Sequence, residues 1–207
     1  MSLYTYAILT GSQGTDGSIK NWINDTRVPS TFVLAEAQAY IYSRLRVREM
    51  IATDQMTFAA GDSEHALPTG FQAPIWLKFH GDSDPLCYVH EQLLRRSTDE
   101  AGDLFEGLPS RWTIVGGEIW LDVKHEDGGD AEFVYLGTPA DLSGANTTNF
   151  LTDRFPTVLL EACLMVAFRW KKDMEAMTAA RLRCDSEIAT ANKTFDLARF
   201  TQNLMRG

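Results

Sequence analysis

The most apolar segment of the chain is Phe155–Trp170, in which the only charged residues are Glu161 and Arg169. Pro156 suits the first turn of a helix, because a proline there sacrifices no hydrogen bond. Apolar residues at helical spacing fill one face of the segment and much of its remaining surface. The segment is too short to span a membrane, which takes about 20 apolar residues. The pattern therefore predicts a central helix covered by other helices, with a neighbouring subunit as a further candidate cover.

Helical periodicity also marks segments before and after this one. Ser18 is a suitable N-cap for a short helix over Ile19–Asn24. A longer helix is predicted over Thr31–Thr53, where apolar residues recur on one face and arginines crowd the second half. A long amphipathic helix follows the central segment and is expected to end near Ala191. Its apolar residues keep a near-heptad spacing, which is typical of a helix packed against another helix.

The periodicity changes to alternation between Met56 and Leu136. Gly116-Gly117 is a strong signal for a two-residue hairpin turn. We therefore predict a small antiparallel β insert between the helical parts, and one isolated short strand over Tyr4–Leu9. The predicted strands of the insert are Met56–Ala59, Ala66–Leu67, Ala73–His80, Leu86–Val89, Arg111–Val115, Glu118–Asp122 and Ala131–Leu136.

These patterns predict an α+β protein that is mainly α: a helical bundle with a small antiparallel β insert and an extended C-terminal tail. The bundle would comprise residues 1–55 and 137–194, the insert residues 56–136, and the tail residues 195–207. Terminal segments are usually disordered unless they dock on a partner. The tail is a candidate partner-binding peptide because it is apolar, with Phe195, Leu197, Phe200, Leu204 and Met205.

Composition limits the possible partners. The formal net charge of −9 and the pI near 4.9 argue against a protein that grips nucleic acid over its whole surface. The sequence is still compatible with an acidic surface past which DNA moves without being bound. The three cysteines are widely spaced, which favours isolated thiols in a reducing compartment.

Candidate chemistry is sparse. The glycine-containing loop Thr10–Ser18 precedes a helix, but the Lys-Ser/Thr pair and the βαβ unit of a phosphate-binding loop are missing, so a flexible lead-in is favoured. No Ser, Cys or Thr has the sequence context of a strained nucleophile turn. We therefore predict no catalytic residue, no cofactor and no metal site, and expect that the chain is not an enzyme. The four histidines also lack metal-ligand spacing; they are His65, His80, His90 and His125.

The sequence leading into the predicted central helix carries a family signature. It reads LSGANTTNFL over residues 142–151, then Phe-Pro at 155–156 and Leu-Glu-Ala at 160–162. This resembles the C-terminal signature of tailed-phage adaptor proteins, the head-to-tail connector subunits of podovirus-type phages. Phe150 replaces a Trp of that signature and Thr157 an Asp. The matching positions are Asn146, Thr148, Asn149 and Leu151.

The resemblance extends to the N-terminal half. Ile19–Asn24 and Phe32–Met50 are similar to the first two helices of that family. Leu67-Pro-Thr-Gly-Phe71 is similar to its Leu-Pro-x-Asp-Phe turn, with Gly where Asp is usual.

The resemblance implies a virion structural protein. Such an adaptor forms a ring, commonly of twelve subunits, that binds the portal protein and receives the tail nozzle or tail-tube protein. DNA would pass through without specific binding, and no membrane is involved. The protein would be assembled in the host cytoplasm and located at the head-tail junction of the virion.

The resemblance also assigns candidate site residues. The C-terminal segment is expected to reach along the portal, so the five apolar tail residues would dock there. We expect the subunit interface around Arg44, Arg46, Arg48, Glu161 and Arg169. A solvated helix face is the alternative for the three clustered arginines. A structural ion pair is an alternative for Glu161 and Arg169, which lie about two helical turns apart.

The sequence is also compatible with two other functions. A head-completion stopper or tail-tube component would contact the adaptor in place of the portal. A small nucleotide- or metal-dependent enzyme would use the Thr10–Ser18 loop or the histidines.

Overall fold

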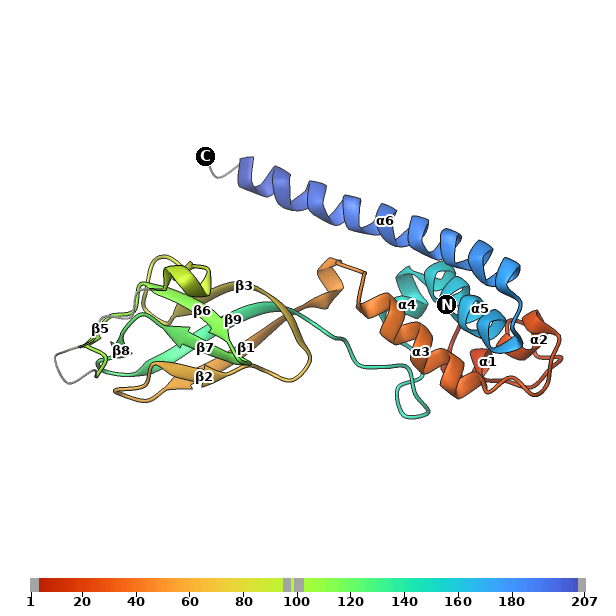
Figure 1. Ribbon diagram of the computed structural model, residues 1–207, viewed down its shortest axis with the longest axis horizontal. Coiled ribbons are helices and arrows are strands. Elements are labelled where there is room, and N and C mark those ends of the chain that lie inside the picture. Colours follow the sequence, from red (N-terminus) through yellow and green to blue (C-terminus); the bar gives the residue numbers. More distant parts are fainter. Residues whose placement is uncertain (1–3, 95–97, 99–102, 205–207) are drawn as a thin grey trace. The chain divides into compact units, whose positions relative to one another are not determined.

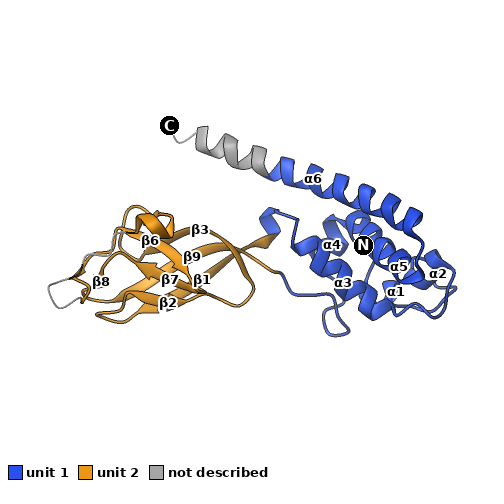
Figure 2. Ribbon diagram, viewed as in Figure 1, with its two compact units in different colours: residues 1–49, 139–207 blue, residues 50–138 orange. Residues whose placement is uncertain are grey.

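The computed structural model describes residues 4–94, 98 and 103–204, and side chains in the last helix up to residue 195. It contains two compact units (Figure 2). Unit 1 comprises residues 1–49 and 139–207, and unit 2 comprises residues 50–138.

Unit 1 is helical and is built around helix α5 (Figure 1). Helix α5 contacts four of the other helices, α2, α3, α4 and α6, and nine of its residues between Val158 and Ala167 are buried. Pro156 is its first residue, as expected. The predicted central helix is therefore confirmed. The helices of unit 1 are α1 (Tyr6–Leu9), α2 (Ile19–Ile23), α3 (Ser30–Tyr42), α4 (Phe150–Arg154), α5 (Pro156–Lys171) and α6 (Met174–Leu204).

Local capping explains where the short helices begin. The hydroxyl of Ser18 accepts a hydrogen bond from the backbone N–H of Asn21, so Ser18 is the N-cap of α2 as predicted. Tyr4–Leu9 was expected to be a strand, which is wrong, because Thr5 caps the single-turn helix α1. Helix α4 was not predicted as a separate helix. Asn149 and Thr152 form a capping box at its start.

The predicted helix over residues 31–53 is too long. Helix α3 ends at Tyr42, a 3₁₀ turn follows over Arg48–Met50, and the chain then enters a strand. Asn192 of α6 accepts a hydrogen bond from the backbone N–H of Arg46 and donates one to the carbonyl of Arg44. Tertiary contacts therefore satisfy backbone groups that a continuing helix would have satisfied itself.

The described part of unit 2 contains nine strands in three sheets and a 3₁₀ turn over Glu91–Leu93. The first sheet has the order β1-β9-β3, the second β2-β7-β6-β4, and β5 pairs with β8. Gly116 and Gly117 both have positive φ and connect β6 to β7, as the hairpin signal predicted. The strands are β1 (Ile51–Phe58), β2 (Glu64–Ala66), β3 (Phe71–Phe79), β4 (Cys87–Tyr88), β5 (Glu106–Gly107), β6 (Arg111–Val115), β7 (Glu118–Leu121), β8 (Lys124–His125) and β9 (Gly129–Gly137).

The core of unit 2 joins the two larger sheets. Phe58, Leu77 and Phe133 of the first sheet cluster with Trp112 and Ile119 of the second, and all five are nearly or completely buried. The indole of Trp112 donates a hydrogen bond to the carbonyl of Leu86 at 3.2 Å, so its polar atom is satisfied inside the core.

The predicted fold class is wrong in calling the protein mainly a helical bundle. The β part is a compact unit with its own core and three sheets, and two of its strand pairs, β4 with β6 and β5 with β8, are parallel. The last helix also continues to Leu204, well past the end expected near Ala191. Short strands with distant partners leave a weak sequence signal, because pairing register is a tertiary property.

The two units differ strongly in charge. Unit 2 carries 16 Asp and Glu against 5 Lys and Arg, a net charge of −11. Unit 1 carries 12 Asp and Glu against 14 Lys and Arg, a net charge of +2. The acidic character of the whole chain therefore comes from the β unit alone.

Candidate functional site

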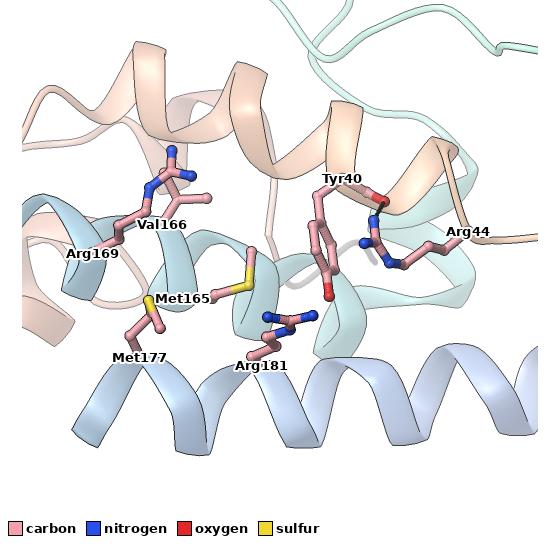
Figure 3. Close-up of a pocket in the computed structure, with 7 residues that line it drawn as sticks. All are labelled: Tyr40, Arg44, Met165, Val166, Arg169, Met177 and Arg181. Atoms are coloured by element: carbon pink, nitrogen blue, oxygen red, sulfur yellow. Dashed lines mark hydrogen bonds between the residues drawn. The ribbon is translucent and has the colours of Figure 1, made fainter. Parts of the chain in front are cut away.

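Unit 1 contains a surface groove of about 210 Å³ between helices α3, α5 and α6 (Figure 3). Each helix contributes residues four positions apart, which places them on one face. Buried Met165 and Val166 of α5 form part of its apolar lining. The lining residues are Tyr40 and Arg44 of α3, Met165, Val166 and Arg169 of α5, and Met177 and Arg181 of α6.

One carboxylate organises the polar side of the groove. The phenol of Tyr40 donates a hydrogen bond to Oδ1 of Asp185 at 2.5 Å. The guanidinium of Arg181 lies 3.6 Å from Oδ2 of the same carboxylate. Burial, and then the hydrogen bond to Asp185, raise the pKa of Tyr40 above its ordinary value. The phenol is therefore a fixed, protonated donor at neutral pH.

Arg44 carries the groove cation that no described carboxylate neutralises. Its guanidinium carbon lies 3.9 Å from the centre of the Tyr40 ring, a cation–π contact, and it donates a hydrogen bond to the hydroxyl of Ser43 at 2.9 Å. No carboxylate of the described residues forms an ion pair with it. Arg169 differs, because it pairs with Glu36 of α3 at 2.6 Å. The groove thus combines three guanidiniums with two neighbouring carboxylates and is positive.

The structure distributes the five expected interface residues over several places. Arg44 and Arg169 both line the groove. Arg46 turns back instead, and its guanidinium donates to the carbonyl of Tyr42, the last residue of α3, at 3.3 Å and to that of Leu45 at 2.8 Å. Arg48 is exposed.

Glu161 does not pair with Arg169. Its Oε1 accepts a hydrogen bond from Nε of Arg183 on α6 at 2.9 Å, while its Oε2 is buried without a hydrogen-bond partner. These two charged residues of α5 therefore make separate contacts: Glu161 contacts α6 and Arg169 contacts α3.

Tyr40, Arg181 and Asp185 were not predicted from the sequence as residues of a common site. The available signal was their spacing, since Tyr40 lies four residues before Arg44 and Arg181 four residues before Asp185. Spacing of this kind is frequent on helices. It becomes informative once α3 and α6 are known to flank the same part of α5.

The expected docking tail lies mostly outside the described side chains. Phe195 is partly buried at the end of the described side chains. The side chains of Leu197, Phe200, Leu204 and Met205 lie outside the described residues.

Other candidate chemistry has little support. In the part of the chain that the structure describes, no group of three or more His, Cys, Asp and Glu is placed to hold a metal ion. The Thr10–Ser18 loop uses its own polar groups, since the hydroxyl of buried Ser18 donates to the carbonyl of Ser12 at 3.0 Å. No helix among the described residues is long and apolar enough to cross a membrane.

Comparison with known proteins adds one finding. The family model described as SU10 adaptor protein matches residues 15–202, a range that includes all of unit 2 and most of unit 1. No curated protein matches the sequence.

Proposed function

The chain belongs to the SU10 adaptor protein family, a family of phage structural adaptors, and from this premise we propose that it is a head-to-tail adaptor of the virion. Its copies form a ring, commonly of twelve, that binds the portal on one side and the tail nozzle or tail-tube protein on the other. The observation that carries this proposal is the family match over residues 15–202.

Exposed apolar side chains support a role in protein contacts. In unit 1, Trp22 and Phe32 are 53% and 54% exposed, and in unit 2 Tyr88 and Phe105 are 50% and 52% exposed. Aromatic residues are enriched in the cores of protein interfaces. The exposed aromatic residues of both units are therefore candidate contacts with neighbouring subunits, the portal and the tail protein.

The charge of unit 2 supports passage of DNA without specific binding. With a net charge of −11, it repels the phosphate backbone, whereas proteins that hold DNA neutralise phosphates with Lys and Arg. A channel formed by acidic units would let DNA slide through.

We propose further that the C-terminal segment docks on the portal through Phe195, Leu197, Phe200, Leu204 and Met205. One such contact is weak on its own, because association costs translational, rotational and side-chain freedom. Repetition around a ring makes each later contact effectively intramolecular and multiplies the avidity.

The test is reconstitution with purified portal rings. We expect the purified chain to be ring-shaped only when the portal is present, with the number of copies counted by native mass spectrometry and cryo-electron microscopy. Deleting residues 195–207 should abolish or strongly weaken portal binding.

Leu182→Ser provides the matched control, because Leu182 is an apolar residue of the same helix and is 66% exposed. This variant should bind the portal normally. A full-length chain that binds only another connector component, and not the portal, would contradict the proposal.

A further inference from the structure

The groove between α3, α5 and α6 is too small for most small molecules. Its volume of about 210 Å³ lies below the roughly 300–1,000 Å³ that ligand pockets usually have. A site of this size suits one or two side chains of a protein partner.

The lining specifies which side chains these are. Arg44 and Arg181 offer guanidinium donors, and Arg44 has no carboxylate partner among the described residues. Met165 and Met177 offer thioether sulfurs, which make favourable contacts with aromatic rings. The matching partner is a segment that presents a carboxylate directly beside an aromatic ring.

Unit 2 carries such a segment. Phe105 is 52% exposed, and the adjacent Glu106 is also exposed. Glu106 lies in β5, whose pairing with β8 holds it opposite Lys124. None of the described residues forms an ion pair with the Glu106 carboxylate.

We infer that the groove of one copy receives Phe105 and Glu106 of a neighbouring copy, an inference that rests on the proposed ring. The charge separation favours this pairing, since a unit of net charge +2 meets a unit of net charge −11. The Glu106 carboxylate binds between Arg44 and Arg181, and the Phe105 ring packs on the two methionines. Because groove and segment are different surfaces, the contact is heterologous, the type that closes into rings.

The test uses full-length variants and measures self-association by native mass spectrometry and sedimentation, alone and on portal rings. Arg44→Glu should weaken association at least about tenfold, and so should the double substitution Phe105→Ser with Glu106→Ser. Combining Arg44→Glu with Glu106→Arg exchanges the two charges and should recover most of the loss. Circular dichroism and melting temperature should be unchanged in each variant, because the altered side chains are exposed.

A mixture of two variants gives the most direct test. The Arg44→Glu chain keeps an intact segment, and the Phe105→Ser, Glu106→Ser chain keeps an intact groove. Together they should form pairs that do not grow further. A mixture that forms no such pairs would overturn the inference.

The control changes another exposed acidic and apolar pair of unit 2, with Glu91→Gln and Leu93→Ser. This variant should associate like the wild type, and an equal loss would overturn the assignment of the segment. A wild-type chain that stays monomeric both alone and on the portal also overturns it. Portal binding is measured separately. If Arg44→Glu associates normally on the portal, only this inference is overturned. If the chains form groove-dependent pairs but do not bind the portal, only the proposed portal role is overturned.

Discussion

Asn192 is predicted to fix the point where α3 stops. Its Oδ1 lies 2.6 Å from the backbone nitrogen of Arg46, and its Nδ2 lies 2.9 Å from the carbonyl of Arg44. Each hydrogen bond contributes about 0.5–1.5 kcal/mol, and alanine regains about 0.5 kcal/mol of helix propensity in α6. Asn192→Ala should therefore lower the free energy of unfolding by about 0.5–2.5 kcal/mol. For a chain of this size the corresponding fall in melting temperature is about 1–10 °C.

The assay is thermal unfolding together with hydrogen exchange. The amide of Arg46 should lose protection in Asn192→Ala, while amides within α5 should lose none beyond the global change. Thr190→Ala is the control, because Thr190 is exposed and bonds only to the carbonyl of Ser186 in its own helix. It should be neutral or slightly stabilising. An Asn192→Ala chain with unchanged melting temperature and unchanged Arg46 protection would show that local sequence alone ends α3.

Two further predictions concern backbone strain and buried thiols. In thermal unfolding, Gly128→Ala should be more destabilising than Gly116→Ala by about 2 kcal/mol or more. The φ angles of the two glycines are similar, +68° and +62°. However, a Cβ at Gly128 would meet backbone atoms at 2.6–2.8 Å, whereas a Cβ at Gly116 would meet open space. Equal losses would refute the clash. Burial raises the pKa of the Cys184 thiol to about 12, and it also raises the pKa of the Cys163 thiol. Their contribution to stability should be complete below about pH 8.5, the unfolded value, and fall as the pH rises toward 12, because only the unfolded chain then ionises. A thiol reagent at pH 8 should label exposed Cys87 alone, and rapid labelling of all three cysteines in the native chain would contradict the burial.

Several features of this protein were encoded locally and were predicted from the sequence. Pro156 followed by a nearly uncharged apolar run sufficed to predict the central helix. Gly116-Gly117 sufficed for the hairpin, because two consecutive positive φ angles are easily adopted only by glycine. These signals need no knowledge of distant residues.

The groove between α3, α5 and α6 was not predictable in this way. Its cations come from α3, α5 and α6, and Arg44 and Arg181 are separated by more than a hundred residues of sequence, including all of unit 2. Periodicity shows which face of a helix is apolar, but it does not show which other helix covers that face.

Charge pairing followed the same division. The sequence identified Glu161 and Arg169 as the two charges of the central helix. In the tertiary structure Glu161 forms an ion pair with Arg183, and Arg169 forms one with Glu36. Tertiary structure likewise ended α3 through Asn192 and assembled the short strands into a separate unit. Local sequence determines which conformations a segment favours, whereas partners across the fold decide where a segment ends and which charges meet, because those energies arise only when distant segments pack together.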